Sequence, residues 1–339
     1  MNKPVKEVVI FEDYSDFEKG KASIKKSTES SAEIKQTNPK KEPSKDTSSV
    51  GANIPAVLIP PRVRRNGSSN DTQQQTKKTT LTRSRILTVA SGIEIPTVNS
   101  NQMETAKLFA REMGLTQTQF VENGAFGISA MVLKAIGGHR RIQPENHNAA
   151  PVIVILVGPT AIGEFGIAAA RHLANRGCQV IISLLEDSYS NSTFEQYKAL
   201  AKFSGARFVS SINDLPDPYT MPVDIILDAL LGPEMLKITP TIKMQMDWAN
   251  NNKAPVLSIE FPSGVNPNNG SVPDDSSAFI QPKWTLCLGA PYIGCTSRNV
   301  TGELFLADTG LPFLCFEKAV GNFHIPWGSE FVLALEYAS

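Results

Sequence analysis

Pro151-Val-Ile-Val-Ile-Leu-Val157 runs directly into Gly158-Pro-Thr-Ala-Ile-Gly163-Glu-Phe-Gly166, and a helical pattern follows over 168–174. An unbroken apolar run of this kind predicts a strand that is buried on both faces of a parallel sheet. Further strands are expected at 180–185, 207–209, 223–227, 256–259, 284–288 and 304–306. Helices are expected at 101–113, 116–136, 191–204 and 239–252. This alternation predicts an α/β fold, a Rossmann-like three-layer sandwich with a mostly parallel central sheet.

The N-terminal part of the chain has a different composition. Residues 1–92 hold 17 Lys+Arg and 10 Asp+Glu, which leaves 16 basic and 23 acidic residues for 93–339. Residues 1–92 are rich in Ser, Thr, Lys and Gln, and such a composition buries too little apolar surface to offset chain entropy. We therefore predict a disordered basic arm over 1–92 and one folded domain over 93–339. A basic arm on an acidic domain fits contact with nucleic acid or an acidic protein, and equally fits a merely solvated tail.

Two apolar islands interrupt the arm. One, within 1–20, combines acidic residues with Val9, Phe11 and Phe17; the other covers 54–59 and is followed by arginines. Each island is either a partner-binding segment that folds on contact or an apolar stretch of linker.

Cysteine and histidine spacing argues against a metal site. No two cysteines form a C-x-x-C pair, and the four histidines are scattered. We expect buried thiols in a reducing compartment rather than disulfides, and no metal. No apolar run reaches the ~18–20 residues of a membrane span, so we expect a soluble, intracellular chain with no membrane contact.

Ligands of such folds gather at the carboxyl ends of the strands, where four loops carry the candidate site. In the first loop, glycines would admit a phosphate to a helix N-terminus, but Glu164 would repel it and Phe165 would fill its space. A strand-end aspartate such as Asp228 binds a cation, acts as a base or braces a loop. These loops offer no lysine or histidine as a partner, which makes a thin catalytic set. The candidate pocket residues are Gly158, Pro159, Gly163, Phe165, Gly166, Asp228, Glu260, Ser263 and Tyr292.

The order and spacing of these loops, from Pro96 to Pro312, resemble the YjeF N-terminal domain family, which includes NAD(P)H-hydrate epimerase. Epimerases of the family carry a G-x-G-N-N-G-G-D-G loop, a lysine and a D-x-P-S-G motif. At the matching positions this chain has Ala161, Ile162, Phe165, Tyr292 and Glu260. The resemblance therefore implies a degenerate, non-catalytic pocket without a cofactor. Binding of an NAD-like small ligand in this pocket is the alternative.

One branch of that family, the enhancer of mRNA decapping 3 proteins, is degenerate in a similar way. Residues 171–175 and 325–332 resemble this branch, and the segment near 1–20 resembles half of its FDF segment, which binds a DEAD-box RNA helicase. The branch's N-terminal LSm domain has no counterpart here, so Met1 is a candidate internal start.

The resemblance implies a dimeric scaffold of cytoplasmic processing bodies that activates mRNA decapping. It would form a homodimer through its C-terminal domain and bridge the decapping enzyme complex to the helicase, with Val9, Phe11 and Phe17 as partner contacts. An epimerase-like enzyme and a nucleotide-ligand sensor are the alternatives. Basic residues that would contact RNA are Arg62, Arg64, Arg65, Lys77, Lys78, Arg83 and Arg85.

Overall fold

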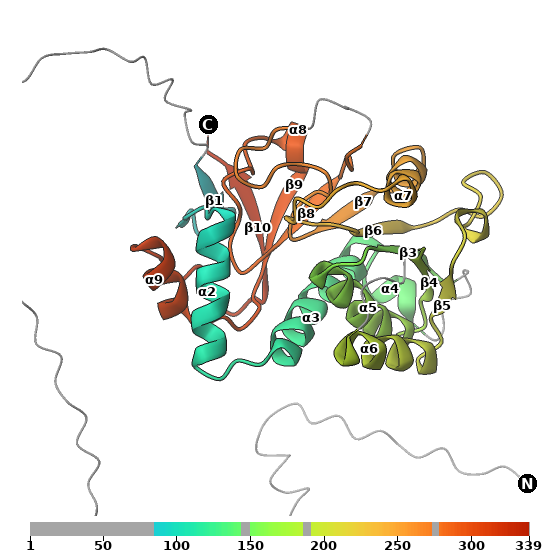
Figure 1. The fold of residues 1–339 in the computed structure, drawn as a ribbon, viewed down its shortest axis with the longest axis horizontal. Coiled ribbons are helices and arrows are strands. Elements are labelled where there is room, and N and C mark those ends of the chain that lie inside the picture. Colours follow the sequence, from blue (N-terminus) through green and yellow to red (C-terminus); the bar gives the residue numbers. More distant parts are fainter. Residues whose placement is uncertain (1–84, 144–149, 186–190, 273–277, 339) are drawn as a thin grey trace, which may run out of the picture. The chain divides into compact units, whose positions relative to one another are not determined.

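The computed structural model describes residues 85–143, 150–185, 191–272 and 278–338 (Figure 1). The proposed partner contacts Val9, Phe11 and Phe17 lie outside these residues, and so do all the proposed RNA contacts except Arg85. Within the described ranges, no helix is long and apolar enough to cross a membrane.

A ten-stranded sheet forms the centre of the domain, in the order β2-β1-β10-β9-β8-β7-β6-β3-β4-β5. The strands from β9 to β5 are all parallel, whereas β10 and β1 add antiparallel pairings at the other end. The prediction of a mostly parallel α/β sheet is confirmed. The strands are β1 (Ile86–Thr88), β2 (Glu94–Ile95), β3 (Val152–Val157), β4 (Gln179–Leu184), β5 (Arg207–Val209), β6 (Ile225–Ala229), β7 (Val256–Ile259), β8 (Trp284–Leu288), β9 (Glu303–Ala307) and β10 (Val332–Tyr337).

The longer helices begin where the sequence supplies a cap. Asn99 and Thr116 each form a capping box, with Gln102 and Gln119 respectively, so the helices after them start as expected. The helices are α2 (Ser100–Glu112), α3 (Gln117–Ala135), α4 (His139–Ile142), α5 (Ala161–Ala174), α6 (Ser192–Phe203), α7 (Pro240–Asn250), α8 (Arg298–Thr301) and α9 (Phe313–Val320), with a 3₁₀ turn at Ile212–Asp214.

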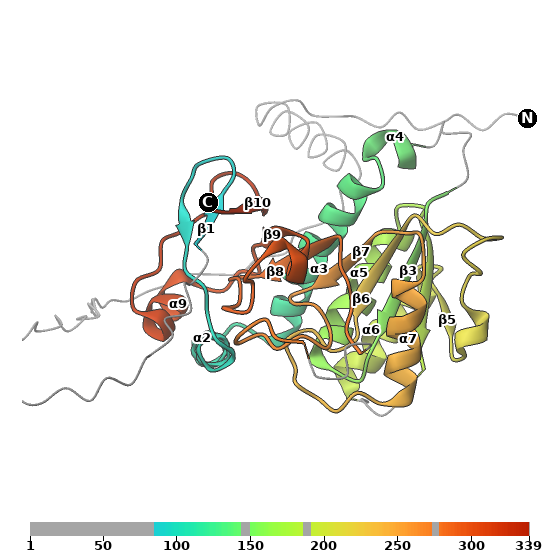
Figure 2. The same cartoon turned by 90° about the horizontal axis from the view of Figure 1, so that it is seen from above.

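Side chains of β3 divide the core into two layers. Ile153 and Ile155 belong to one buried cluster, and Val154 and Leu156 belong to another. The first cluster also takes buried residues of α3, α5 and α6, whereas the second takes those of α7. Helices therefore cover both faces of the sheet, as the two views show (Figures 1 and 2), and the three-layer arrangement is confirmed.

The folded part begins before residue 93. Strand β1, which we placed in the arm, pairs with β10, and its Ile86 is completely buried. The predicted boundary is wrong here because β1 is too short to show a pattern of its own. Its stability comes from pairing with a strand at the far end of the chain.

Candidate functional site

The order of the strands reverses between β3 and β6, and the loops that follow these strands touch each other. The N–H of Gly158 donates to Ala229 O at 3.0 Å, and Thr160 Oγ1 donates to Leu230 O at 3.0 Å. A Cβ atom on Gly158 would lie only 1.9 Å from Leu230 O. Gly158 therefore permits a loop-to-loop contact in the glycine loop, where the sequence offered a phosphate site.

The expected glycine loop ends much earlier than Gly166. Thr160 is the N-cap of α5, and its hydroxyl accepts from Gly163 N. A Cβ on Gly163 would lie 2.6 Å from Gly158 O, and one on Gly166 would lie 2.7 Å from the Ala229 methyl. The interpretation of 158–166 as one loop is wrong, because the later glycines allow a helix to lie close against the sheet.

Glu164 and Phe165 face different surroundings. The buried Glu164 carboxylate accepts from Gln117 Nε2 at 3.3 Å and from Asn191 Nδ2 at 3.0 Å, so it ties α5 to its neighbouring helices. Phe165 lies edge-on against Phe120, with 5.3 Å between the ring centroids.

Asp228, at the end of β6, is completely enclosed by its own chain. Its carboxylate accepts from Ser258 Oγ at 2.7 Å, from Ser263 Oγ at 2.6 Å, and from the backbone N–H groups of Ser263 and Leu230. Burial raises the pKa of the Asp228 carboxyl, while these hydrogen bonds oppose the rise. Of the three roles open to Asp228, the geometry matches the loop brace.

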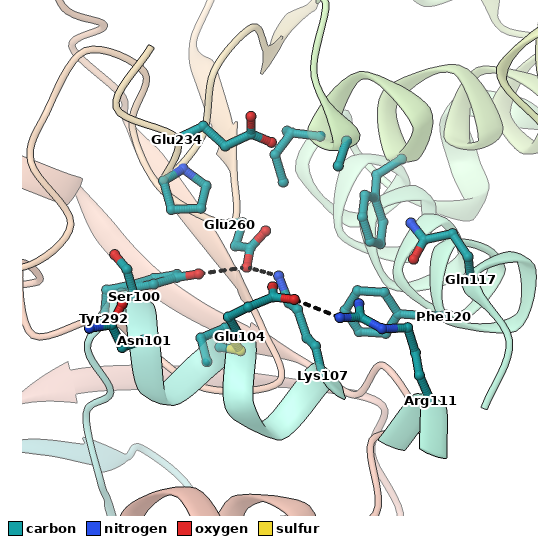
Figure 3. A pocket seen from close by; sticks show the side chains of 15 residues that line it. Ser100, Asn101, Glu104, Lys107, Arg111, Gln117, Phe120, Glu234, Glu260 and Tyr292 are labelled. Carbon is teal, nitrogen blue, oxygen red and sulfur yellow. Dashed lines mark hydrogen bonds and ion pairs between the residues drawn. The ribbon is translucent and has the colours of Figure 1, made fainter. Parts of the chain in front are cut away.

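A cavity of about 390 Å³ lies beside this brace, at the carboxyl ends of β7 and β8 (Figure 3). Three of the predicted pocket residues line it, namely Phe165, Glu260 and Tyr292. The other lining residues are Ser100, Asn101, Met103, Glu104, Lys107, Arg111, Gln117, Phe120, Ala161, Ile162, Pro233 and Glu234. The remaining predicted residues, Gly158, Pro159, Gly163, Gly166, Asp228 and Ser263, do not belong to the lining.

Glu260 is the centre of the polar group in this cavity. Lys107 Nζ lies 3.0 Å from its Oε1, and the Tyr292 hydroxyl donates to the same oxygen at 2.9 Å (Figure 3). The other oxygen, Oε2, is buried without a hydrogen-bond partner in the described residues. Glu260 also has a φ of 65°, a left-handed conformation that strains a residue with a side chain.

Lys107 is the functional residue that the loops did not reveal, because it comes from α2 rather than from a strand end. Met103, Ala106 and Ala110 are the buried face of α2. A lysine one helical turn after Met103, at the edge of that apolar face, is the signal that could have found it.

Two further charged features frame the cavity. The Arg111 guanidinium pairs with Glu104 at 2.6 Å where both side chains reach solvent. Burial raises the pKa of the Glu234 carboxyl, and the backbone N–H of Ala161, the first residue of α5, opposes the rise.

The cavity combines carboxylate acceptors with aromatic walls. Burial and the nearby Glu260 carboxylate raise the pKa of Tyr292 well above its ordinary value, so the phenol keeps its proton. The described residues contain no group of three or more His, Cys, Asp or Glu side chains that could hold a metal ion.

Arg85 does not line this cavity. It forms a hydrogen-bonded ion pair with Glu94 at 2.7 Å, and both side chains are exposed. That pairing occupies the one described arginine that we expected to contact RNA.

The fold and cavity define a Rossmann-like α/β domain with a ligand-sized pocket at the carboxyl edge of its sheet. The family described as "YjeF-related protein N-terminus" matches residues 117–294. The chain belongs to this family, which confirms the resemblance drawn from the loops.

Two kinds of relative are similar to the chain. Enhancer of mRNA-decapping protein 3 from Macaca fascicularis is 34% identical over 250 residues, and the human protein is 33% identical. Each match covers 73% of this chain and 46% of the relative, so the chain spans about half the length of these proteins. NAD(P)H-hydrate epimerase from Dehalogenimonas lykanthroporepellens is 31% identical over 252 residues, which is 96% of that protein.

A solved structure shows the same fold. The crystal structure of the yeast protein ynu0 matches with a TM-score of 0.58 at 21% identity, covering 71% of this chain and all of that one. At this identity the likeness concerns the fold alone.

Proposed function

We propose that the protein is a non-catalytic dimeric scaffold that activates mRNA decapping and promotes processing-body assembly in the cytoplasm. The observation that carries this proposal is the similarity to Enhancer of mRNA-decapping protein 3, at 33–34% identity across 73% of the chain. The chain is comparably similar to an epimerase, so the site has to decide between the two activities.

The site favours the scaffold. A catalytic carboxylate at the end of β6 would have to face a ligand, and Asp228 is instead completely buried among serine and backbone donors. The first loop ends at Thr160, and the later glycines, Gly163 and Gly166, lie in α5 and allow its close contact with the sheet. The carboxylate next to the cavity, Glu260, is also completely buried and already has two donors on one oxygen.

As a scaffold, the chain would bring several factors together. The segment with Val9, Phe11 and Phe17 would bind a DEAD-box RNA helicase, the homodimer would form through the C-terminal domain, and the basic arm would add salt-sensitive RNA contacts. Two copies of each partner site raise binding through avidity without any new contact.

The experiment that tests this proposal is capture by the immobilised full chain. We expect it to retain a DEAD-box helicase and the decapping enzyme, and to raise the rate of cap removal in a purified decapping reaction. A triple variant, V9A/F11A/F17A, should lose the helicase and keep the decapping enzyme. Failure of the wild-type chain to retain either partner or to change the decapping rate would contradict the proposal.

An epimerase is the second candidate, and one observation favours it. Lys107, Glu260 and Tyr292 form a contiguous acid–base group in the cavity. If this group were catalytic, the purified chain would turn over hydrated nicotinamide cofactor and Glu260→Gln would abolish that turnover. We expect no turnover from either protein, with a known epimerase as the positive control.

A further inference from the structure

A second cavity, of about 230 Å³, lies between the loop after β9, helix α9 and the segment that follows α9. It shares no lining residue with the cavity around Glu260. Four of its ten lining residues are aromatic, and one is charged. Its volume is below the ~300–1,000 Å³ of ordinary ligand pockets and suits a single side chain.

Helix α9 and the segment after it supply the aromatic walls. Phe313 and Phe316 are about one helical turn apart and therefore lie on the same side of α9. The helix ends at Gly321, whose φ of 95° favours glycine and redirects the chain. Phe323 then stacks on Phe316, with 4.6 Å between the ring centroids and 14° between the rings, and Trp327 adds the fourth ring. The faces of these rings carry negative electrostatic potential, so the walls attract cations as well as apolar groups.

Asp308 is the sole charged residue in this lining. It follows β9, and its Oδ1 accepts from the N–H of Gly310 at 2.8 Å, which restricts the orientation of the carboxylate. None of the ion pairs among the described residues involves Asp308. Lys318, the cation of α9, lies instead over the Phe109 ring, 4.6 Å from its centroid. The cavity therefore combines aromatic walls with a negative charge that has no counter-charge.

These features match a cation with few hydrogen-bond donors. An unmodified lysine ammonium has three donors and is strongly hydrated, and one carboxylate replaces only part of that hydration. Methylation keeps the charge and replaces donors with methyl groups, which pack on ring faces while the charge stays close to the carboxylate. An anion would be repelled by Asp308, and a neutral apolar group would remove water from that carboxylate without supplying a counter-charge.

We propose that this cavity binds the methylated ammonium group of a lysine in a partner polypeptide, with the four rings as walls and Asp308 as the counter-charge. Phe313 is 44% exposed and Ile325 is 51% exposed, so the rim offers apolar surface on which residues beside the lysine would pack. The inference goes beyond the scaffold function and does not rest on it, since it concerns this cavity alone.

Binding of matched probes to the full chain tests this proposal. The probes are acetylated trimethyllysine amide, the same compound with unmethylated lysine, and a neutral isostere in which carbon replaces the ammonium nitrogen. The readout is the NMR signal of the Trp327 indole N–H, identified by its loss in Trp327→Phe. We expect trimethyllysine to shift this signal and to bind at least about fivefold more tightly than the other two probes. Equal or tighter binding of either of them, or no shift by trimethyllysine at millimolar concentration, would overturn the proposal.

Choline distinguishes a polypeptide from a free small cation as the source of the methylated group. Choline lacks the alkyl chain of lysine, so we expect it to bind more weakly than trimethyllysine. Equal or tighter binding of choline would overturn the assignment to a polypeptide.

Variants separate the charge from the rings. Asp308→Asn keeps an acceptor for Gly310 and removes the charge, so it should weaken trimethyllysine at least about fivefold and leave the isostere unchanged. Phe313→Leu keeps an apolar side chain and removes a ring, and should weaken trimethyllysine at least about twofold. Glu317→Gln, an exposed change on α9 outside the lining, is the matched control for net charge and should leave the affinity as it is. Unchanged affinity in Asp308→Asn, or an equal loss in Glu317→Gln, would overturn the role of Asp308, and unchanged affinity in Phe313→Leu would overturn that of the aromatic rim.

Discussion

Asp228 and Glu260 are both completely buried carboxylates at the ends of neighbouring parallel strands, and their hydrogen bonds differ. Asp228 has donors on both oxygens, from Ser258, Ser263 and the backbone. Glu260 has two donors on one oxygen and none on the other, and its backbone is strained. A carboxylate with donors on both oxygens braces the loops around it, whereas Glu260 keeps one oxygen without a partner in the described residues.

The largest loss of stability is expected when the Asp228 carboxylate, which braces the loops, is removed. Asp228→Ala leaves two buried hydroxyls and two buried N–H groups without their acceptor, at about 1–3 kcal/mol for each unsatisfied group. Even after relaxation we expect a loss of at least about 3 kcal/mol, which lowers the Tm by roughly 6–12 °C in a domain of this size. Circular dichroism melting measures it, and a Tm within about 2 °C of the wild type would remove the distinction between the two carboxylates.

A smaller loss of stability is expected when the Tyr292 hydroxyl is removed. Tyr292→Phe removes the hydrogen bond to Glu260 Oε1 while Lys107 stays in place, so the free energy of unfolding should fall by about 0.5–1.5 kcal/mol. Urea unfolding monitored by fluorescence gives this value. A loss as large as that of Asp228→Ala would mean that Glu260 is a second brace.

Glu260→Gln should cost about 1–3 kcal/mol, because Gln keeps an acceptor for Tyr292 but leaves the largely buried Lys107 ammonium without its counter-charge. Glu260→Gly is the matched probe of strain, since glycine adopts a φ of 65° freely. The same urea titration applies, and a loss above about 3 kcal/mol for Glu260→Gln would contradict the interpretation.

The smallest effect concerns pH and lies away from both carboxylates. Burial and the neighbouring Arg171 lower the pKa of His172, while Glu122 opposes them. Since the folded pKa lies below the unfolded value, the unfolded chain binds more protons between the two, so stability should fall as the pH drops through about 6.5. Melting between pH 7.5 and 5 should show a shallower fall in His172→Gln than in the wild type. An identical slope in both proteins would assign the pH dependence to other groups.

The interior of the fold could be predicted from the sequence because its strands are buried on both faces. The runs at 256–259 and 284–288 match β7 and β8 at both ends. Strands β1, β2 and β10 escaped prediction because they are short or half exposed and depend on pairing with distant segments. Their stability is a tertiary property that no local pattern contains.

The candidate site was predictable only in part. Glu260 and Tyr292 stand at strand ends, where the fold class directs attention, and both line the cavity. Lys107 is separated from Glu260 by 153 positions and lies on a helix, so only the three-dimensional arrangement pairs them. The glycines of 158–166 resemble a phosphate loop, but the same residue type also lets a helix approach a sheet closely.

The mass of the full chain in solution tests the dimeric scaffold most directly. Light scattering across a concentration series should give about 74 kDa, twice the 36.8 kDa of one chain. That mass should persist at the lowest concentration that the instrument reads, since a scaffold that works through avidity must remain paired. A mass of 36.8 kDa throughout the series would contradict the proposal.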